Sequence, residues 1–577
     1  MMLWSYSYLR TLLLLALFLL RDTLAQDVYD FDTCKADIER ILNGTLSIGD
    51  INNTTIDQYI WDGIVQGIDK HFPRDQYLAL TYDGCIAICG DKVALNDAPK
   101  ALGIAATWIF PLAILFSLPF DSLHRSHARR TLEAVSNWLG SPQTALTATI
   151  FNFRQIRECH RRVKEANDIQ SVWRDALFVL SCFNQFDLLG ASASPVVTVN
   201  VFIYGLFRPL SLGDNDDDTI LLRDLLKAIA HQLRMLRRRG VIPTLLSLGT
   251  FLVAFVFSVA LAFGDLGDNT TAHSLALGLL FSWLPLLVIF TIVDRNPISA
   301  VRSAELMERW LYNVSKIRQW KLTRGAEIEW WSSEIAGERP FLVGDFVGQG
   351  RRLRYCGLTS AVLEVSKEHM GRFDTTIASF DDCGRDVCGK LEDGKPASWY
   401  VISFSSLLLV WTEVMMAFMV SFNTPTVGLG CRSLSYLLVA IFSSVSWFIN
   451  FWKRPPTPAC VISHIANAIV IVLLVAIIGF QLTGGMSNCY CKASMLNVPY
   501  LSGYGGYVDF ENAQFYKENF NVQTYWAIGT TFGGLIPLIA FVVVTFRWKM
   551  CAGLWSANER TQGYQFQPVH ANMDWLR

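Results

Sequence analysis

Residues 459–482 read ACVISHIANAIVIVLLVAIIGFQL, a run without a single Asp, Glu, Lys or Arg. An α-helix rises about 1.5 Å per residue, so a helix of this length crosses the hydrocarbon core of a bilayer, which is about 30 Å thick. A helix this long and this apolar is solvated by lipid better than by water. The stretch therefore predicts a membrane-spanning helix.

The same pattern recurs and predicts an all-α integral membrane protein with about seven transmembrane helices. Apolar residues make up 52% of the 577 residues and charged residues only 17%, whereas a soluble protein carries about a quarter charged residues. The predicted spans are 101–120, 241–263, 274–293, 398–421, 433–452, 459–482 and 524–546. The formal net charge is −1, which gives no support for binding to nucleic acid.

Residues 1–25 have the pattern of a secretory signal peptide. Arg10 precedes a short apolar run, and Thr23 and Ala25 supply the small-x-small pattern that signal peptidase accepts. We expect cleavage near Ala25, which leaves residues 26–100 as a luminal or extracellular segment. An uncleaved anchor is the alternative, and it leaves that segment on the same side.

Basic residues agree with this orientation, because cytosolic loops of membrane proteins hold an excess of Lys and Arg. Of the 49 Lys and Arg residues, 38 fall in the segments predicted to be cytosolic and 9 in those predicted to face outside. The cytosolic segments are 121–240, 294–397, 453–458 and the tail 547–577. The largest later outer loop is 483–523.

Four asparagines in the predicted outer segments lie in N-glycosylation sequons. They are Asn43, Asn52, Asn53 and Asn269. Asn313 also lies in a sequon, but the predicted topology places it in the cytosol, where it stays unmodified.

Six cysteines fall in the segments predicted to face outside. They are Cys34, Cys85, Cys89, Cys431, Cys489 and Cys491. The secretory pathway is oxidising and a segment as small as 26–100 is marginal without cross-links, so we expect up to three disulfides. Their connectivity is open, although Cys489 and Cys491 are too close for an easy mutual bridge. Cys383 and Cys388 lack a second Cys or His pair, so we predict free thiols and no metal site.

The two long inner loops, 121–240 and 294–397, are predicted to be helical. Ser141-Pro142 is typical of a helix start, with a capping hydroxyl followed by proline at the first helical position. Residues 191–207 are uncharged and mostly apolar. The mostly apolar run 176–186 precedes them, and we expect the two runs to form a buried or interfacial hairpin packed against the membrane, with a nine-span protein as the alternative.

A juxtamembrane amphipathic helix is predicted at the end of the first inner loop. Four acids within 214–218 precede apolar residues at helical spacing, and three arginines follow them. We expect Arg237, Arg238 and Arg239 to contact anionic lipid headgroups.

Ionisable and amide side chains inside spans are costly to bury, so each is a functional candidate. Glu413 lies in the fourth predicted span, at mid-to-outer depth. His464 and Asn467 lie one turn apart in the sixth span, and Asn450 lies near the inner end of the fifth. We expect these last three to form one polar cluster, which either lines a cytosolic vestibule or bonds helix to helix.

The sequence holds no catalytic motif that we recognise. It lacks a Gly-x-Ser-x-Gly elbow, a His-Glu-x-x-His helix and a Walker loop. We expect neither an enzymatic activity nor a cofactor.

Residues Asp294-Arg295-Asn296-Pro297, with the segment ELMERWLYN at 305–313, resemble a stretch of uncharacterised multi-pass membrane proteins of filamentous fungi. The resemblance covers a short part of the chain. It implies the membrane class and brings no activity, cofactor or site residue.

Two functions fit this organisation. A sensor or scaffold is the first expectation, because 121–240 and 294–397 are large enough to bind cytosolic protein partners. A transporter or channel is the alternative, with Glu413 and the His464, Asn467 and Asn450 cluster along its path. The lipid bilayer is a partner in both cases. The last four residues are not an endoplasmic reticulum retrieval signal, so we expect the plasma membrane, with an endomembrane as the alternative.

Overall fold

The computed structural model describes most of the chain. The described residues are 31–61, 78–90, 135–165, 170–186, 188, 194–210, 216–236, 241–264, 269–287, 300–323, 327–332, 341–344, 346, 357–369, 376–393, 395–423, 429–451, 457–493, 507–510 and 522–554. Four sequence predictions lie outside them, namely the signal peptide, the span 101–120, Arg237–Arg239 and the motif 294–297.

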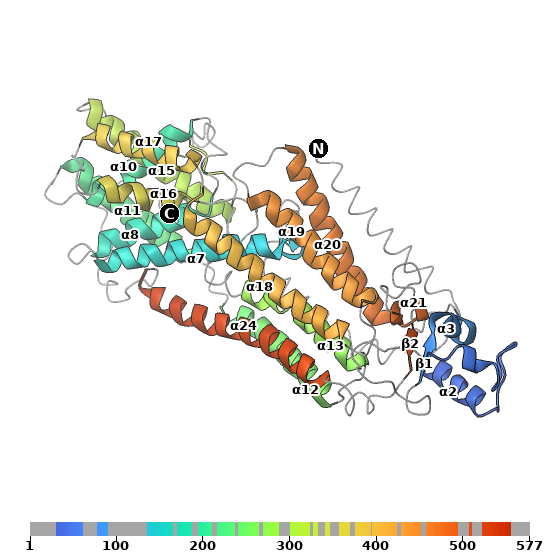
Figure 1. Ribbon diagram of the computed structural model, residues 1–577. Helices are drawn as coiled ribbons and strands as arrows, with labels where there is room; N and C mark the ends of the chain where they lie inside the picture. The colour runs from blue at the N-terminus through green and yellow to red at the C-terminus, as the bar shows by residue number, and fades with distance from the viewer. Residues whose placement is uncertain are drawn as a thin grey trace.

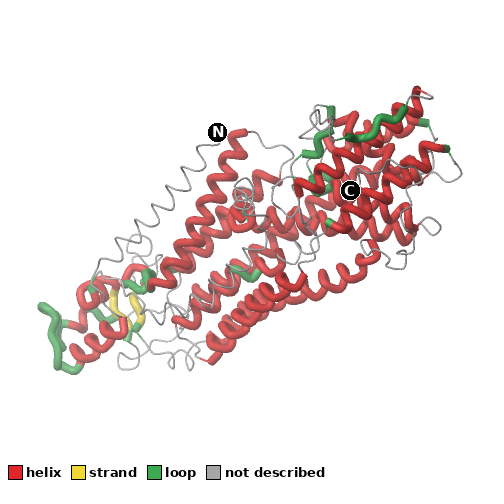
Figure 2. The backbone as a smooth tube through the Cα atoms, turned by 180° about the vertical axis from the view of Figure 1, so that it is seen from behind, coloured by secondary structure: helices red, strands yellow, loops and turns green. Residues whose placement is uncertain are grey.

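The described residues form three parts that follow one another along the molecule (Figure 1). We call them the helical domain, the membrane bundle and the head. Strands occur in the head, where β1 (Ala79–Thr81) pairs antiparallel with β2 (Tyr507–Asp509). The remaining described elements are helices, as the view from behind also shows (Figure 2). The prediction of a helical protein is confirmed.

The membrane bundle consists of apolar helices. They are α12 (Val241–Gly264), α13 (Asn269–Leu280), α18 (Ala397–Phe422), α19 (Cys431–Phe451), α20 (Thr457–Thr483) and α24 (Val522–Met550). In the described part of the chain, 4 helical stretches are long and apolar enough to cross a membrane: Ile377–Phe422, Cys431–Phe451, Pro458–Thr483 and Gln523–Arg547. The apolar parts of α12 and α13 are shorter, at Leu248–Gly264 and Ser274–Leu287. The structure therefore supports a membrane protein with four such helices of the seven expected.

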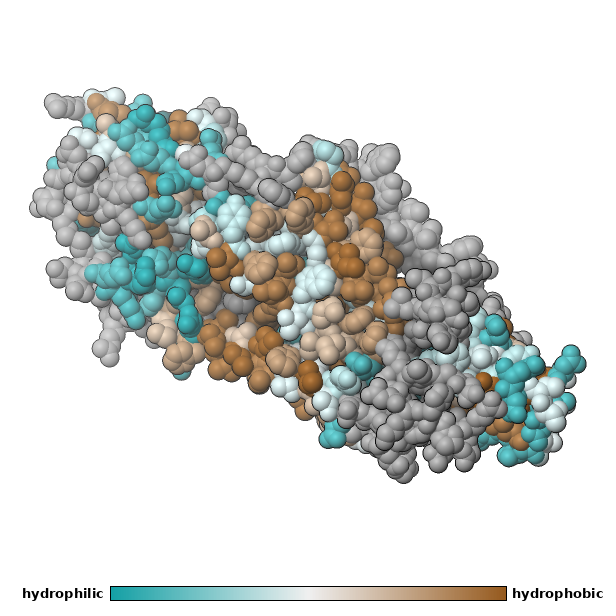
Figure 3. Space-filling view, viewed as in Figure 1, coloured by the Kyte–Doolittle hydropathy of each residue, from teal (hydrophilic) through white to brown (hydrophobic). Residues whose placement is uncertain are grey.

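The outer surface of the bundle suits a bilayer. Hydrophobic side chains gather over the bundle, and hydrophilic ones gather toward both ends of the molecule (Figure 3). Phe404 of α18, Ile462 of α20 and Phe546 of α24 are 55%, 53% and 67% exposed. Large apolar side chains exposed along several neighbouring helices are expected where lipid replaces water.

Small residues bring the bundle helices close together. Gly529 and Gly533, four residues apart on α24, lie against Val420 of α18 and Leu279 of α13. A Cβ at Gly533 would stand 2.4 Å from the Cδ2 atom of Leu279. This spacing of glycines is common where membrane helices pack, because it lets the backbones approach.

The helical domain unites the two inner loops in one hydrophobic core. Its elements are α8 (Gln170–Phe183), α10 (Pro195–Phe207), η3 (Arg208–Leu210), α11 (Asp217–Met235), α15 (Ala300–Thr323), α16 (Leu358–His369) and α17 (Ile377–Asp393). Phe183 of α8 lies at the centre, with ring centroids 4.6 Å from Phe202 of α10 and 5.7 Å from Trp310 of α15. The two predicted inner loops are therefore one folding unit.

Two sequence predictions are corrected by this core. The apolar run 191–207 is not a hairpin against the membrane, because α10 is buried on nearly all sides among α15, α17 and η3. A helix that is apolar all round can equally be the centre of a helical domain. The predicted juxtamembrane helix forms as α11, but Leu222, Leu226 and Leu233 on its apolar face lie in the domain core instead of in lipid.

The head combines chain from before the bundle with the loop between α20 and α24. It contains α2 (Phe31–Leu42), η1 (Ile56–Gln58) and α3 (Tyr82–Cys89) from the segment 26–100, and α21 (Cys489–Lys492) and β2 from the loop 483–523. The disulfides are Cys34–Cys89, Cys85–Cys489 and Cys431–Cys491. All six cysteines expected to form disulfides do so, and the last pair ties the head to the first residue of α19.

Candidate functional site

One helix, α7 (Pro142–Glu165), belongs to both the membrane bundle and the helical domain. Ala145 and Leu146 in its first half lie in the hydrophobic core of the bundle. Ile156 and Cys159 in its second half lie in the core of the helical domain. Figure 1 shows the helix running from the domain to beneath α19. A rearrangement of either core therefore acts on a helix that the other core holds.

The start of α7 lies among the bundle helices. The predicted helix start at Ser141-Pro142 is confirmed, since Pro142 is the first helical residue and the Ser141 carbonyl accepts a hydrogen bond from the Ala145 N–H at 3.1 Å. Trp138, just before it, is fully buried in the bundle core. The sequence placed all of 121–240 in a loop outside the membrane, whereas the structure packs 135–153 beside the spanning helices. A signal was present, because residues 134–153 contain no charged side chain.

Polar side chains surround this helix start. We call them the polar cluster, and its members are Gln143, Ser443, Ser446, Asn450, Ser463 and Asn467. Gln143 of α7 donates a hydrogen bond from Nε2 to Oγ of Ser443 on α19 at 2.7 Å. Asn450 Nδ2 donates to Ser463 Oγ at 3.2 Å, and the hydroxyls of Ser446 and Ser463 lie 2.7 Å apart. The cluster therefore joins α7, α19 and α20 through uncharged groups.

Asn467 lies directly against Gly140, next to the helix interruption at Ser141 that precedes α7. The site of a Cβ on Gly140 is 2.5 Å from Cβ and 2.7 Å from Cα of Asn467, so only glycine allows this approach. Asn467 is 1% exposed, and its Oδ1 and Nδ2 atoms have no hydrogen-bond partner among the described residues. At about 1.5 Å per residue from Thr457, Asn467 lies roughly 15 Å into the bundle. A buried, unpartnered amide inside the bundle is available to a polar ligand or water.

The cluster predicted from sequence is only partly formed. Asn450 and Asn467 belong to the polar cluster, but His464 does not, because it is exposed on the outer face of α20. Ser463 occupies the inward position in its place. Consecutive helical residues are about 100° apart, so a histidine next to the buried Ser463 turns away from the interior. Gln143 and Ser443 were missed because they lie 300 residues apart.

Glu413 is a separate buried site in the bundle. Its side chain is 0% exposed, and Ser282 donates a hydrogen bond to Oε2. Oε1 has no partner within the described residues. Ser282 follows the end of α13, where the helix is interrupted before resuming at 283–287. Glu413 lies two residues beyond Trp411 on α18, whose indole donates a hydrogen bond to Ser444 of α19 at 2.8 Å.

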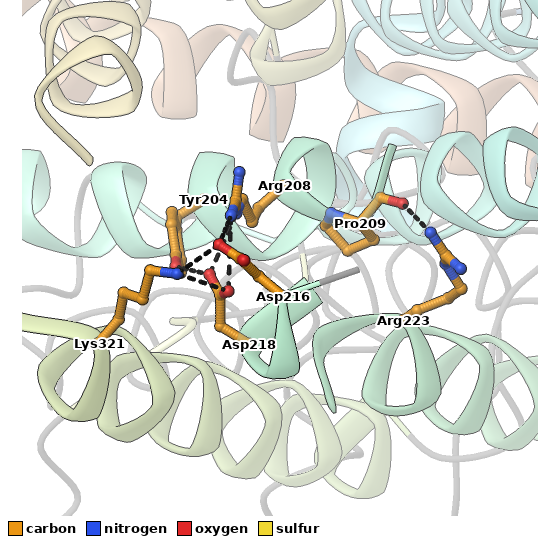
Figure 4. Close-up of polar contacts among 7 residues, drawn as sticks. All are labelled: Tyr204, Arg208, Pro209, Asp216, Asp218, Arg223 and Lys321. Atoms are coloured by element: carbon orange, nitrogen blue, oxygen red, sulfur yellow. Dashed lines mark hydrogen bonds and ion pairs between the residues drawn. The ribbon is translucent and has the colours of Figure 1, made fainter. Parts of the chain in front are cut away.

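A buried ionic cluster joins three helices of the helical domain (Figure 4). Asp218, at the start of α11 and 0% exposed, accepts hydrogen bonds from Tyr204 at 2.9 Å and from Arg208 at 3.1 Å. Lys321 of α15 donates to Asp216 at 2.6 Å and to Asp218 at 3.0 Å. Each acid therefore faces a cation, and the cluster holds α10, α11 and α15 together.

The electrostatics of this cluster favour its charged form. Burial raises the pKa of Asp218, but hydrogen bonds from Arg208, Lys321 and Tyr204 outweigh burial and leave that pKa below its ordinary value. Burial, together with the neighbouring Asp218 carboxylate, raises the pKa of Tyr204. The neighbouring donors thus stabilise the carboxylate form of Asp218, and we assign the cluster a structural role.

The remaining predicted residues are the sequon asparagines and the cysteines of the head. Asn43, Asn52 and Asn53 are exposed, and Asn269 is the first residue of α13, so glycosylation there stays a prediction. Asn313 is 0% exposed and accepts a hydrogen bond from the Trp331 N–H at 2.9 Å, which leaves no room for a glycan. The sulfur atoms of Cys85, Cys89 and Cys489 lie within 4.8 Å of one another, but disulfides consume all three.

No protein-family model, no curated protein and no solved structure matches this chain.

Proposed function

We propose that this protein is a membrane sensor, in which the membrane bundle controls the conformation of a cytosolic helical domain. The observation that carries the proposal is the burial of α7 in two hydrophobic cores, with Leu146 in one and Cys159 in the other. Interiors of proteins are densely packed and resist local deformation. A shift of α7 within the bundle is therefore expected to reach the helical domain.

The cysteines support an orientation with the head outside and the helical domain in the cytosol. All three disulfides lie in the head or at its junction with α19. The free cysteines lie elsewhere, in the helical domain, near the start of α20 or just after α24: Cys159, Cys182, Cys383, Cys388, Cys460 and Cys551. Disulfides persist in the secretory lumen and outside the cell, and free thiols persist in the cytosol.

A continuous set of contacts connects the head to α7. Cys85 links α3 to Cys489 on α21, and Cys491 of α21 links to Cys431, the first residue of α19. Ser443 of α19 then accepts the hydrogen bond from Gln143. We expect a change in the head to reach α7 along these contacts.

The test compares two serine substitutions in the full chain, reconstituted in lipid nanodiscs. Ser443→Ala removes the acceptor for Gln143 of α7, and Ser444→Ala removes the acceptor for Trp411 of α18. We expect Ser443→Ala to increase amide hydrogen exchange in α7 and in α8 of the helical domain. A loss of about 1 kcal/mol corresponds to roughly fivefold faster exchange.

Ser444→Ala is the matched control, because it makes the same chemical change one residue away. We expect it to leave exchange in α8 and α11 unchanged. Equal effects of both substitutions on the helical domain, or no effect of Ser443→Ala there, would contradict the sensor.

A transporter or channel is the second candidate, favoured by the helix interruption at Ser141, next to Gly140 and the unpartnered amide of Asn467. Broken helices near the bilayer midplane are typical of transporter binding sites. We expect Asn467→Ala to abolish solute flux into vesicles whose membrane contains the protein. We expect Glu413→Gln to change the pH dependence of that flux. Flux that neither substitution alters would remove this candidate.

Cytosolic protein partners are expected to bind the helical domain. Because that domain is built from both inner loops, a partner needs the two loops folded together. Trp310 is 0% exposed, so Trp310→Ala disrupts the core of the domain without removing a side chain that a partner could contact. We expect this substitution to release a copurifying partner.

A further inference from the structure

We infer that a cavity at the junction of the membrane bundle and the helical domain binds the anionic headgroup of a membrane phospholipid. The cavity measures about 740 Å³ and is lined by α7, α16 and α18 together with the end of α24. Binding pockets for small ligands have volumes of about 300–1,000 Å³. The inference rests on the membrane placement of α18 and α24, and not on transmission of a signal by α7.

The cavity wall changes character along α7. Ile150, Arg154, Arg157 and Arg161 all line the cavity and lie at helical spacing on one stripe of this helix. The stripe is apolar where α7 is in the bundle and basic where α7 enters the helical domain. An amphiphile with an apolar tail and an anionic head matches this stripe, because its tail can lie beside the apolar part and its head beside the arginines.

Three of the cavity's arginines are available to a ligand. Arg154, Arg157 and Arg547 form no ion pair with any residue of the described ranges. Arg161, by contrast, pairs with Glu158 and Glu165.

The two acids that line the cavity already have cationic partners. Glu158 pairs with Arg161, and Glu364 pairs with Lys390 at 2.9 Å. The unpaired charge facing the cavity is therefore positive. Guanidinium groups bind phosphate through paired, charge-assisted hydrogen bonds.

The apolar part of the cavity is continuous with the lipid-facing surface. Val543 of α24 lines the cavity and is 44% exposed, and Val542 and Phe546 beside it are 56% and 67% exposed. Phe151 and Ile402 form buried apolar walls from α7 and α18. Acyl chains can therefore leave the cavity along α24, which favours a phospholipid over a soluble anion. Basic pockets between membrane helices at the cytosolic surface are known lipid headgroup sites.

The test uses the full chain in phosphatidylcholine nanodiscs with and without phosphatidylinositol 4-phosphate. Native mass spectrometry measures how much of the anionic lipid stays bound. We expect retention by the wild type and about thirtyfold weaker binding for the double variant Arg154→Gln/Arg157→Gln, at roughly five- to sixfold per arginine. Arg547→Gln, on a different helix, should weaken binding about fivefold.

The matched control is the double variant Arg302→Gln/Arg385→Gln. It removes the same charge from half-exposed Arg302 and exposed Arg385, which pair with Glu305 and Asp382 within their own helices and do not line the cavity. It should bind the lipid as the wild type does. Equal loss in both double variants would mean general electrostatic attraction and would overturn the site.

A second arm separates the lipid from a soluble anion. The deacylated headgroup, glycerophosphoinositol 4-phosphate, should bind far more weakly than the intact lipid. Equal affinity for the two would overturn the lipid assignment, as would equal retention of phosphatidylcholine. Lipid binding that depends on Arg154 and Arg157 would stand even if Ser443→Ala left exchange in the helical domain unchanged, so failure of the sensor is distinguishable from failure of this site.

Discussion

Gln143 and Ser443 are joined by a hydrogen bond of 2.7 Å although 300 residues separate them in the chain. Gln143 lies in the first turn of α7, and Ser443 lies on α19, which begins at the disulfide-bonded Cys431. Both side chains are buried, at 0% and 1% exposure. Breaking this bond leaves a buried amide without its partner, which costs free energy. We therefore expect α7 and α19 to move together.

Replacing Gly384 with alanine is expected to weaken the helical domain. A Cβ there would meet Oδ1 of Asn200 at 2.1 Å and Cα of Asn200 at 3.0 Å, so the backbones of α17 and α10 would have to separate. We expect a loss of about 1–3 kcal/mol. The measurement is the rate at which the buried thiol of Cys159 reacts with a maleimide in the full chain.

Gly389→Ala is the control on the same helix, because nothing lies within 4 Å of its Cβ position. Alanine favours a helix over glycine by about 1 kcal/mol, so Cys159 should react no faster than in the wild type. Faster reaction in both variants would contradict close packing of Gly384 against Asn200.

Gly140→Ala is expected to displace α20 from the start of α7. The new Cβ would meet backbone as well as side-chain atoms of Asn467, so rotation of one side chain gives no relief. The thermal midpoint of the detergent-solubilised chain should fall, and amide exchange in the first turn of α7 should rise. Gly479→Ala on α20, where nothing lies within 4 Å, should do neither.

Asp218→Asn is expected to destabilise the helical domain at neutral pH by about 3 kcal/mol, since Arg208 is 1% exposed and loses its buried counter-charge. The pKa of Asp218 lies below its ordinary value, so its contribution is complete above the unfolded pKa of about 3.9. It is lost as the pH falls through the folded pKa.

The wild type should therefore lose stability below about pH 4 more steeply than Asp218→Asn, which lacks this titrating group. Thermal midpoints of the two proteins, measured across this pH range, give both slopes. Parallel slopes would show that Asp218 does not carry the acid sensitivity.

Cysteine chemistry on intact cells tests the orientation. Cys34, Cys85, Cys89 and Cys489 are buried, whereas Cys431 and Cys491 are both half-exposed, so mild reduction should open the Cys431–Cys491 disulfide first. A membrane-impermeant maleimide should then label this pair, as mapped by mass spectrometry. The half-exposed thiol of Cys182 should react only after permeabilisation. The reverse pattern would place the helical domain outside.

Glycosylation gives an independent test of the same orientation. Endoglycosidase should increase the gel mobility of the wild type, and less so after Asn43→Gln, because Asn43 is exposed in the head. Wild-type protein that does not shift would contradict an outer head.

The sequence by itself determined which helices are long and apolar enough to cross a membrane where the signal is local. A bilayer requires about twenty consecutive apolar residues, so a span can be predicted from its own residues alone. This holds for 433–452, 459–482 and 524–546. The set of disulfide-forming cysteines was also predictable, because the order of the apolar segments along the chain groups these six apart from the other cysteines.

Tertiary structure decided what depends on partners distant in sequence. The apolar run of α10 is equally consistent with lipid and with a protein interior, and Trp310 and Phe183 packed around it resolve the choice. Residues 135–153 are too polar to read as a span, yet Ser443 and Asn467 supply the contacts that allow them to lie in the bundle. Polar groups are tolerated inside a membrane when neighbouring helices accommodate them, and no local pattern in one sequence reveals those neighbours.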